Sequence, residues 1–528
     1  MAEPAENVTT WRLAAPFRSQ GAKGWIADLP AELHSLTDRN EEPNISRLRL
    51  FEDGRALGPA HAAHANIRDA GGGSYSFWID VLYFSTPDGG DPNVGDRVYT
   101  IDLAPPQAAG KPAAGKSANT KPVSDAADWQ RPGRPLRCAL LGLGNRGIWL
   151  GTLAQQFAGV EVAWVVDESR ERIAEALKLF RHNARGTIDF VEALADPTVD
   201  IVIVAVPDYL HREVAVPAFL AGKHVFLEKP LATTAADAAA ILAAWRQSGR
   251  ILQLGYVLRQ APFYDAIRSV VRDGTLGPIR VASLSEHLDV RHGASFMRRW
   301  HAESRYSGGL LVHKACHDLD IICWLLNGRP QSVSSFGGLD TFAAPAPAKF
   351  CTQCDRRRSC PHVDTGLHER RTPAERANPS AYGLDRCVFR PEKDIVDNQV
   401  VSFVLDTGTR GNFYLAMQRP VRSERRITLV GDDACLDGVF EDGRFTVSFA
   451  DAERPPLTWE ADERSQGGHG GGDRVTMLAF LNACTGHLPP PVTNSEEAMR
   501  GLIFALAAER ARKEGIVVQL DNGDFVLN

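Results

Sequence analysis

Three glycines, Gly142, Gly144 and Gly147, stand in G-x-G-x-x-G spacing directly after a short apolar run. In this spacing the first glycine permits a tight turn, the second lets the backbone approach a pyrophosphate, and the third lets a helix pack close to a strand. A helix that begins here presents unpaired N–H groups and the positive end of its dipole to the pyrophosphate. Asp167 follows 20 residues after Gly147, where a carboxylate accepts hydrogen bonds from the adenosine ribose. The spacing predicts a dinucleotide site, and the alternative is a glycine turn without a ligand.

Asp167 also bears on which dinucleotide would bind. A carboxylate at the adenosine ribose repels the 2′-phosphate of NADP, so this residue favours NAD. Arg170 follows closely and could bind that phosphate, which leaves NADP as the alternative.

A second group of chemically capable side chains lies in the segment 308–326, GGLLVHKACHDLDIICWLL. His313, His317 and Asp320 stand at i, i+4 and i+7, so a helix would place them on one face. An imidazole near its reference pKa of about 6.5 suits proton transfer at neutral pH. We predict that this face meets the substrate and that Asp320 orients His317 or caps nearby backbone. The alternative is a helix that packs its apolar side chains and leaves this polar face solvated.

Four cysteines in an insertion at 351–387, namely Cys351, Cys354, Cys360 and Cys387, have the spacing C-x2-C-x5-C-x26-C. Two thiolates separated by two residues bind one metal readily and two more complete a tetrahedral set, which predicts a structural zinc. His362 could replace one thiolate. An iron–sulfur cluster also uses four thiolates, although the spacing matches neither ferredoxin pattern. The remaining alternative is an arginine-rich loop with free thiols.

The elements that must position the glycine motif extend over residues 136–257. Apolar runs typical of buried parallel strands alternate there with helical patterns. The runs cover residues 137–141, 160–166, 201–206, 223–227 and 251–256. Their order predicts an α/β Rossmann fold, a doubly wound parallel sheet with its ligand at the carboxyl ends of the strands.

Residues 258–528 carry a different pattern. Apolar and polar residues alternate in several runs, which predicts an α+β domain with a mostly antiparallel sheet. These runs cover residues 279–288, 399–406, 410–417, 425–432 and 444–450. The glycine-rich loop 467–473 precedes a helix, and its His469 could reach a substrate hydroxyl. We expect the last helix, 495–514, to pack on the nucleotide domain, and the final GIVVQL strand to join a sheet.

Residues 1–103 are expected to form a separate accessory module. Short β-like runs split by glycine turns predict a small antiparallel β-rich domain. Its Trp78, Tyr83 and Phe84 could stack on a sugar, although aromatic residues in strands usually pack inward. Residues 104–135 are rich in proline, alanine, glycine, serine and lysine and lack large apolar residues, which predicts a linker.

Composition restricts the class of protein. The chain has 528 residues, of which 44% are hydrophobic and 23% charged, as is ordinary for a globular protein of about three domains. A formal net charge of −6 offers no basic field to nucleic acid or to an anionic membrane. No secretory signal is apparent, and no apolar run approaches the ~18 residues of a membrane helix. Nine cysteines, an odd number, suit a reducing cytosol, so we predict a cytoplasmic protein.

Two motifs follow strands of the nucleotide domain: VPDYLH, with Pro207 and His211, and Glu228-Lys229-Pro230. Together with the glycine motif they resemble the Gfo/Idh/MocA family of NAD(P)-dependent sugar and cyclitol dehydrogenases. The resemblance implies that Lys229 lies beside the nicotinamide and the substrate hydroxyl, where an ammonium polarises the reacting oxygen and relays a proton. It also implies a second domain whose sheet makes oligomer contacts, and hence a homo-oligomer. Without the resemblance, Lys229 would be read as a surface lysine before a helix.

The resemblance extends to the segment 308–326. The family carries G-G-x-L-x5-H-x-x-D here, often with an aspartate four residues before the histidine. This chain keeps the histidine as His317, which the resemblance implies is the base. His313 stands at the aspartate position, which puts carboxylate-assisted catalysis in doubt.

Each candidate residue has a predicted role. Catalysis is assigned to Lys229, His317 and His313. Cofactor binding is assigned to Gly142, Gly144, Asn145, Arg146, Gly147, Asp167, Pro207, His211, Glu228 and Lys229. Substrate binding is assigned to Lys314, Asp320 and His469, and metal binding to Cys351, Cys354, Cys360 and Cys387.

The predicted reaction is the NAD-dependent oxidation of a secondary hydroxyl of a sugar, cyclitol or sugar nucleotide, or the reduction of the matching ketone. One alternative is an NAD-dependent glycoside hydrolase that oxidises C3 transiently. The other is a non-catalytic partner protein that binds glycan.

Overall fold

The structure, a computed structural model, contains two compact units, Met1–Thr120 and Lys121–Asn528, each described here by itself. The residues that it describes are 10–13, 15–20, 23–37, 46, 48–58, 67, 72–78, 81–95, 97–103, 129, 132–180, 184–363, 375–376, 378–380, 382–419, 422–465, 467–487 and 495–521.

The first unit consists of two four-stranded antiparallel sheets, which confirms the predicted β-rich module. Their strand orders are β1-β8-β4-β5 and β2-β3-β7-β6. The strands are β1 (Thr10–Arg12), β2 (Arg18–Gln20), β3 (Gly24–Asp28), β4 (Leu48–Glu52), β5 (Arg55–Ala56), β6 (Tyr75–Trp78), β7 (Val81–Ser85) and β8 (Tyr99–Leu103).

The core of this unit joins the two sheets through aromatic rings. Phe17, Phe84 and Tyr99 pack against one another with ring centroids 5.1–5.3 Å apart. Phe84 therefore belongs to the core, as aromatic residues in strands usually do. Tyr83 is half-buried. The side chain of Trp78 and residues 104–128 of the predicted linker lie outside the described residues.

The second unit begins with a six-stranded parallel sheet of order β11-β10-β9-β12-β13-β14, which confirms the predicted Rossmann fold. Its strands are β9 (Leu136–Leu141), β10 (Val160–Val166), β11 (Arg185–Thr187), β12 (Ile201–Val204), β13 (His224–Leu227) and β14 (Leu252–Leu254). The connecting helices are α2 (Asn145–Gln155), α3 (Arg170–Leu179), α4 (Phe190–Ala195), α5 (His211–Leu220) and α6 (Ala235–Ser248). Strand order reverses between β9 and β12, so the loops after these two strands frame the crevice where such sheets bind ligands.

The local sequence explains these elements. β12 is the run Ile-Val-Ile-Val, in which no side chain is more than 1% exposed, as expected for a sheet covered on both faces. The side chain of Ser169 caps α3 by accepting a hydrogen bond from N of Arg172, and Thr234 caps α6 in the same way. Gly249 ends α6 in the left-handed conformation that glycine adopts without strain.

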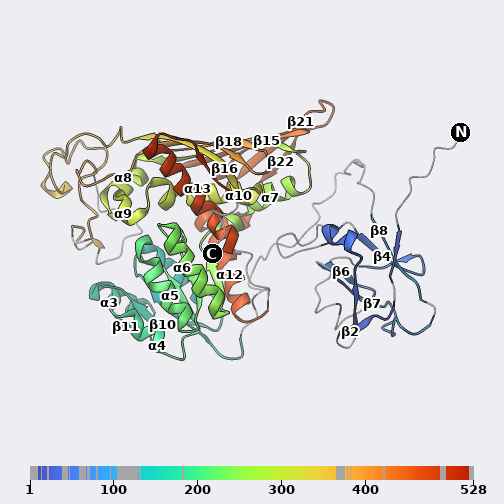
Figure 1. Ribbon diagram of the computed structural model, residues 1–528. Coiled ribbons are helices and arrows are strands. Elements are labelled where there is room, and N and C mark those ends of the chain that lie inside the picture. The colour runs from blue at the N-terminus through green and yellow to red at the C-terminus, as the bar shows by residue number, and fades with distance from the viewer. Residues whose placement is uncertain are drawn as a thin grey trace. The chain divides into compact units, whose positions relative to one another are not determined.

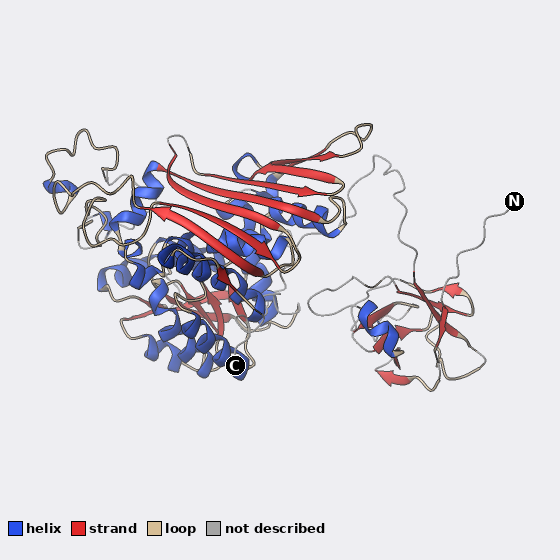
Figure 2. Ribbon diagram, turned by 45° about the horizontal axis from the view of Figure 1, so that its top comes forward, coloured by secondary structure: helices blue, strands red, loops and turns tan. Residues whose placement is uncertain are grey.

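A nine-stranded sheet of order β22-β21-β20-β19-β15-β18-β17-β16-β23 follows (Figure 2). Neighbouring strands are antiparallel except β15 and β18, which confirms the predicted mostly antiparallel sheet. The strands are β15 (Ile279–Asp289), β16 (Pro330–Gly338), β17 (Asn398–Leu405), β18 (Arg410–Arg419), β19 (Glu424–Gly431), β20 (Ala434–Val439), β21 (Arg444–Phe449), β22 (Leu457–Glu460) and β23 (Val518–Gln519). The pairing of β23 with β16 confirms that the final strand joins a sheet. β16, β20 and β22 are not among the predicted runs: β16 holds few apolar residues, β20 lacks regular alternation of apolar and polar residues, and β22 has only four residues.

Helices lie against one face of this sheet (Figures 1 and 2). They include α7 (Pro262–Arg272), α10 (Cys316–Leu325) and α13 (Ser495–Glu514), and α8 (Val290–Arg298) and α9 (Ser304–Ser307) lie nearby. No helix in the described part of the chain combines the length and the apolar character needed to cross a bilayer.

The packing of the last two long helices differs from the prediction. α13 packs mainly between α10 and β16, with the Phe504 ring 5.2 Å from that of Phe403, and it reaches the nucleotide domain at α6. The expectation that it packs on the nucleotide domain is therefore wrong for most of its length. α12 (Gly472–Cys484) packs there instead, because its Phe480 lies in the core beside Phe226 of β13, at 5.6 Å.

Candidate active site

The glycine turn between β9 and α2 has the geometry of a pyrophosphate cradle. Gly142 adopts a positive φ of 91°, and a Cβ there would lie 2.5 Å from the carbonyl oxygen of Ala205. A Cβ on Gly147 would lie 1.8 Å from the carbonyl oxygen of Gly142. Gly144, the N-cap of α2, differs because a Cβ there would meet nothing within 4 Å. The start of α2 therefore has open space beside it, which fits a pyrophosphate.

Asp167 lies directly after β10, at the carboxyl edge of the parallel sheet. Its Oδ2 accepts a hydrogen bond from N of Leu143 at 2.8 Å, and its Oδ1 accepts one from N of Ser169 at 2.9 Å. The carboxylate thus joins the glycine turn to the start of α3. Arg172 lies 3.7 Å from Oδ2, whereas the Arg170 side chain is exposed. The cation beside this carboxylate is Arg172, which the sequence pattern does not indicate.

The cysteine-rich insertion reaches the same edge of the nucleotide domain. Arg172 forms an ion pair with Glu375 at 2.7 Å, and its guanidinium lies 4.4 Å from the ring centre of Tyr382. The hydroxyl of Tyr382 is 3.1 Å from Oγ of Ser169. The insertion therefore contacts the first turn of α3, next to Asp167.

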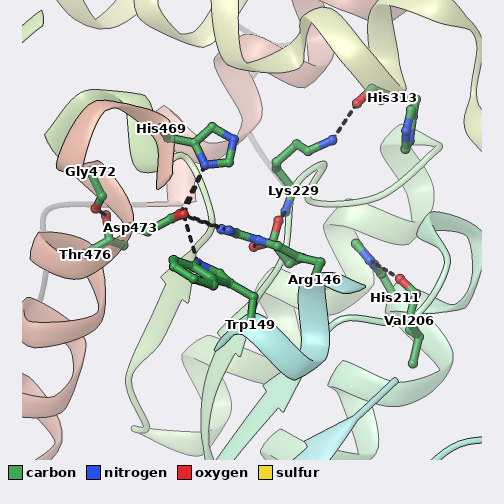
Figure 3. Close-up of polar contacts among 11 residues, drawn as sticks. Arg146, Trp149, Val206, His211, Lys229, His313, His469, Gly472, Asp473 and Thr476 are labelled. Carbon is green, nitrogen blue, oxygen red and sulfur yellow. Dashed lines mark hydrogen bonds and ion pairs between the residues drawn. The ribbon is translucent and has the colours of Figure 1, made fainter. Parts of the chain in front are cut away.

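Arg146, the second residue of α2, is the centre of an ion-pair network (Figure 3). It donates to Oε1 of Glu228 at 2.6 Å and to both carboxylate oxygens of Asp473 at 2.8 and 2.9 Å. Nε1 of Trp149 and Nδ1 of His469 lie 3.1 and 3.2 Å from the same carboxylate. Burial raises the pKa of Asp473, but the hydrogen bonds from His469 and Arg146 outweigh burial and hold that pKa below its ordinary value. The sequence does not single out Asp473 or Trp149, because Arg146 and Trp149 lie more than 300 residues from Asp473 along the chain.

Two residues assigned to the cofactor have protein partners. Glu228 accepts the hydrogen bond from Arg146, and His211 is fully buried. Nδ1 of His211 lies 2.8 Å from the carbonyl oxygen of Pro230, and Nε2 lies 3.2 Å from that of Val206 (Figure 3). His211 thus ties the loop after β12 to the loop after β13. The cofactor assignment of both residues stays a prediction, and their contacts show that they hold these loops in place.

Lys229 follows β13 and points toward the second domain (Figure 3). Its Nζ donates a hydrogen bond to the carbonyl oxygen of His313 at 2.8 Å. After burial, the positive charge of Lys229 is the largest cause that lowers the pKa of both His313 and His317. The structure therefore brings Lys229 together with the two histidines that the sequence assigns to catalysis.

The segment around His313 is not the straight α-helix that its spacing predicts. Leu311–Ala315 form a π-helix, η6, and α10 begins after it. Because a π turn holds more residues than an α turn, His313 does not lie directly above His317. Their rings have different neighbours: His313 lies 4.4 Å from the His301 ring, and His317 lies 5.6 Å from the His469 ring. Such π turns occur often at functional sites.

His317 lies in a buried environment beside Tyr256, at a ring distance of 6.1 Å. Burial and the charge of Lys229 lower the pKa of His317 well below 6.5, so the expectation of an ordinary pKa is wrong. The imidazole is neutral at pH 7 and can accept a proton, although a lowered pKa weakens it as a base. Within the described residues its Nδ1 is buried and has no hydrogen-bond partner.

A carboxylate that the sequence does not single out lies against His313. Oδ2 of Asp208, the first residue of η3 (Asp208–Leu210), is 2.5 Å from Nδ1 of His313. Burial raises the pKa of Asp208 to about 7, against the opposing charges of Lys229 and His211. Asp208 stands inside the VPDYLH motif, but nothing in the linear pattern connects it with a histidine 105 residues later.

A row of aromatic rings extends from His313 to the surface, and we call it the aromatic row. The Trp300 ring lies 5.2 Å from that of His313 and 4.0 Å from that of His301. Tyr209 lies 6.2 Å from Trp300 and 4.8 Å from Tyr306, and it is 41% exposed. The row presents flat apolar faces beside the candidate bases. The sequence does not reveal it, because its members come from separate segments.

Lys314 and Asp320, both assigned to the substrate, are buried in ion pairs. Nζ of Lys314 donates to Oε1 of Glu286 in β15 at 2.7 Å. Both carboxylate oxygens of Asp320 accept hydrogen bonds from Arg259, at 2.6 and 2.7 Å. Asp320 is therefore paired with Arg259, and no hydrogen bond between it and His317 is found among the described residues. These contacts do not favour the predicted substrate roles.

His469 lies at the site, as its substrate assignment requires. Its backbone has a φ of 51°, which is uncommon for a residue other than glycine. Nδ1 of His469 lies within hydrogen-bond distance of the Asp473 carboxylate. The centre of the His469 ring is 5.6 Å from the centre of the His317 ring. The side chain is 35% exposed, so it can meet a ligand.

The four cysteines of the insertion, together with His362, line one cavity of about 280 Å³. None of them forms a disulfide. Among the residues that the structure describes, no group of three or more His, Cys, Asp or Glu side chains is arranged so that it could hold a metal ion. The zinc prediction is therefore not supported. The iron–sulfur alternative needs the same thiolates and is not supported either.

Both domains of the second unit match models of known protein families. Residues 136–256 match a model described as an oxidoreductase family with an NAD-binding Rossmann fold, and residues 264–437 match the Gfo/Idh/MocA C-terminal domain. Together the two matches cover more than half of the chain.

Individual relatives and solved structures agree with these matches. YteT of Bacillus subtilis (strain 168) is 29% identical over 371 residues, which are 64% of this chain and 86% of YteT. Inositol 2-dehydrogenase of Salmonella typhimurium (strain LT2) is 31% identical over 207 residues, 38% of this chain and 57% of that enzyme. The structure of levoglucosan dehydrogenase with NADH and levoglucosan has a TM-score of 0.59 at 17% identity, and it covers 74% of this chain and all of that one. The WlbA dehydrogenase of Bordetella pertussis with NADH and UDP-GlcNAcA has a TM-score of 0.57 at 20% identity, covering 74% of this chain and 99% of the other. With its glycine cradle, its Glu-Lys-Pro loop and both domains matched, the chain belongs to the Gfo/Idh/MocA family of NAD-binding oxidoreductases.

Proposed function

We propose that this protein is an NAD-dependent oxidoreductase that oxidises a secondary hydroxyl of a sugar or cyclitol, or reduces the matching ketone. The observation that carries the proposal is the position of Lys229. It follows β13, which β12 separates from β9 and its glycine cradle, and it contacts the segment of His313 and His317. The relatives include dehydrogenases of inositol and scyllo-inositol and a 1,5-anhydro-D-fructose reductase, which supports this class of substrate.

Each group in the site has a defined part in this reaction. When bound, NAD supplies the hydride acceptor. The Lys229 ammonium holds and polarises the reacting oxygen, and this stabilises negative charge that develops there. A neutral imidazole, of His313 or of His317, takes the hydroxyl proton. Fixed positions for these groups matter because proximity supplies much of the rate.

The aromatic row supports a ring-shaped substrate. The apolar C–H face of a sugar or cyclitol packs well against flat aromatic side chains, which bury a large area. Trp300 and Tyr209 offer such faces, and Tyr209 lies at the surface end of the row. His469, at the other side of Lys229, can bind a ring hydroxyl.

Asp167 supports NAD as the preferred cofactor. Its carboxylate follows β10 at the carboxyl edge of the sheet, where we expect the adenosine ribose, and it would repel a 2′-phosphate. Arg172 lies 3.7 Å away and is already paired with Glu375 at 2.7 Å. This pairing leaves Arg172 less available to a phosphate.

A panel of polyols, sugars and sugar nucleotides with NAD, followed by NADH fluorescence, tests the function. We expect NADH to form with at least one cyclitol or sugar that has a free secondary hydroxyl. Release of a glycosyl leaving group without net NADH would favour the glycoside hydrolase alternative. Tight glycan binding without turnover of any compound would favour the non-catalytic partner and contradict the proposal.

We also propose a homo-oligomer that forms through the nine-stranded sheet. One face of this sheet is not covered by α7, α10 and α13 (Figure 2), and the sheet has exposed apolar residues that pair across strands, Phe336 with Val400 and Val281 with Val430. They are 38–76% exposed, with Phe336 the most exposed. Sedimentation velocity of the wild type and of Phe336→Asp tests this, and a wild-type monomer at micromolar concentration would contradict it.

A cytoplasmic location is a further part of this proposal. None of the nine cysteines forms a disulfide, as is usual for proteins in a reducing compartment. Fractionation of cells that produce the protein tests the location.

A further inference from the structure

The closest polar contact of the His313 ring is with a buried carboxylate. Oδ2 of Asp208 lies 2.5 Å from Nδ1 of His313, and the two side chains are 6% and 11% exposed. Asp208 begins η3 just after β12, and His313 lies in the π turn before α10. The pair therefore joins the carboxyl edge of the nucleotide-binding sheet to the second domain, beside Lys229.

We propose that Asp208 is a positioning residue, and that it forms a carboxylate–imidazole pair in which Nε2 of His313 takes the proton of the substrate hydroxyl. This proposal rests on the proposed oxidoreductase function and assigns the base that the function requires. In this arrangement Asp208 supplies a carboxylate to the site, whose position 313 holds a histidine and not the aspartate that the family often carries there.

The geometry favours His313 over His317 as the base. A carboxylate at Nδ1 holds the ring in the tautomer with the proton on Nδ1, and this leaves the lone pair of Nε2 free. Within the described residues, Nδ1 is the His313 ring nitrogen that has a hydrogen-bond partner, so Nε2 is available. His317 has no such support, because its buried Nδ1 has no partner in the described part of the chain.

The proton balance of the step suits this environment. In oxidation the substrate O–H bond breaks and an Nε2–H bond forms, while the carbon-bound hydrogen leaves as hydride in the reaction proposed above. The pair changes from a net charge of −1 to a neutral imidazolium–carboxylate pair, so it does not become positively charged beside Lys229. In ketone reduction Nε2 returns the same proton to the oxygen.

The charged and titratable groups around the pair set its pH dependence. Those that face Asp208 or His313 are Lys229, His211, Glu228, Lys314, Arg299 and His301. Burial raises the pKa of Asp208 to about 7 and lowers the pKa of His313 well below 6.5, so the pair holds one extra proton below about pH 7. Oxidation needs the pair without that proton, so kcat/KM should fall as the pH drops through about 7. Ketone reduction needs the proton, so it should fall as the pH rises through the same range.

The test compares Asp208→Asn with the wild type, using NAD and a substrate from the panel. Asn keeps the shape but removes the charge, so we expect kcat to fall roughly 10²-fold, the scale of general base catalysis, with the affinity for NADH unchanged. Loss of the carboxylate lowers the pKa of His313 further, so the acid limb of kcat/KM should move to lower pH. Asp208→Glu should recover part of the rate. Glu213→Gln, which removes an exposed carboxylate from the start of α5, is the matched control and should behave as wild type.

Two outcomes would overturn the proposal. One is an Asp208→Asn variant whose kcat lies within twofold of wild type and whose acid limb lies within 0.3 pH units of wild type. The other is a loss of kcat without any movement of the acid limb, because a merely structural role would have that effect.

A second readout separates this proposal from the proposed function. Trp300 lies 5.2 Å from the His313 ring, and a change in the net charge of the pair changes the fluorescence of an indole this close. The pH titration of fluorescence, taken as the difference between wild type and Trp300→Phe, therefore reports the pair without any turnover. We expect a midpoint near pH 7 that moves to lower pH in Asp208→Asn. A difference signal that does not change with pH, or a midpoint that is the same in Asp208→Asn as in wild type, contradicts the pair even if the enzyme is active. An inactive enzyme that shows the expected titration contradicts only the oxidoreductase function.

Discussion

Nζ of Lys229 donates a hydrogen bond to the main-chain carbonyl oxygen of His313 at 2.8 Å. The contact joins the nucleotide domain to the segment that carries both candidate bases, so the ammonium is held while its remaining two N–H groups stay available. A substrate oxygen bound at Lys229 would lie beside an imidazole, and the predictions below follow from this arrangement.

Lys229→Ala should reduce turnover without abolishing cofactor binding. The side chain acts on the reacting oxygen, whereas the glycine turn holds the pyrophosphate, so we expect kcat to fall by roughly 10² or more and the Kd of NAD to stay nearly unchanged. Steady-state kinetics and fluorescence titration with NADH measure the two quantities. Lys178→Ala, a change of an exposed lysine on α3, is the control and should leave both unchanged. Unchanged turnover in Lys229→Ala would refute its role.

Gly144→Ala and Gly147→Ala should differ in a way that locates the pyrophosphate. A Cβ at Gly147 would lie 1.8 Å from the carbonyl oxygen of Gly142, so this variant should lose both stability and NAD binding. A Cβ at Gly144 would meet nothing within 4 Å, so Gly144→Ala should keep its Tm but bind NAD at least tenfold more weakly, because the methyl group enters the ligand space.

Thermal unfolding and isothermal titration measure these effects. The control is Gly133→Ala, in the segment before β9, where a Cβ also has open space. Wild-type NAD affinity in Gly144→Ala would show that the pyrophosphate lies elsewhere.

Asp473→Asn should destabilise the fold and change its response to acid. The carboxylate, whose side chain is 3% exposed, pairs with Arg146, and breaking a buried ion pair costs about 3–5 kcal/mol. Its pKa is lowered in the folded state, so its contribution is complete above the unfolded pKa near 3.8 and is lost as the pH falls through the folded pKa.

Urea denaturation at pH 7 and near pH 3 tests this prediction. The free energies of unfolding of wild type and Asp473→Asn should differ most at pH 7 and less near pH 3, where the unfolded carboxylate takes up a proton while the folded carboxylate, with its lower pKa, does not. Asp451→Asn, an exposed aspartate in the loop before β22, should show no difference at either pH. A constant difference at both pH values would contradict the ion pair as the cause.

Asp167→Asn should shift cofactor preference toward NADP. Asn keeps an acceptor for N of Leu143 but removes the charge that repels the 2′-phosphate. The ratio of kcat/KM for NADP to that for NAD should rise roughly tenfold. A wild type that already prefers NADP tenfold would contradict the role given to Asp167.

Removal of metal should leave the protein unchanged. No described group of side chains is arranged to hold a metal ion, although four cysteines line one cavity. We expect elemental analysis to find no stoichiometric zinc or iron, and EDTA to leave Tm and activity unaltered. About one metal per chain, lost together with stability on chelation, would restore the original prediction.

The sequence alone supports a good part of the fold and of the cofactor site. The spacing of Gly142, Gly144 and Gly147 predicts a turn whose glycines the structure shows to be required at two of the three positions. The buried run Ile201–Val204 predicts a parallel strand, and the alternating runs after residue 278 predict an antiparallel sheet. These features are readable because they depend on local periodicity, on turn chemistry and on burial of neighbouring residues.

The contacts of the reactive side chains were decided by the tertiary structure. The spacing of His313, His317 and Asp320 predicts one shared face, but the π turn separates the two histidines and Arg259 takes the carboxylate. Asp208 reaches His313 across 105 residues, and Asp473 reaches Arg146 across 327. A helix pattern gives the direction of a side chain only while the helix stays regular, and a linear pattern holds no information on which distant charge will be packed against it. The sequence by itself determined that a dinucleotide cradle and two domains form, whereas the partners of the ionisable groups followed from how those domains pack, because a buried polar group without a partner is costly and most such groups therefore pack within hydrogen-bond reach of one.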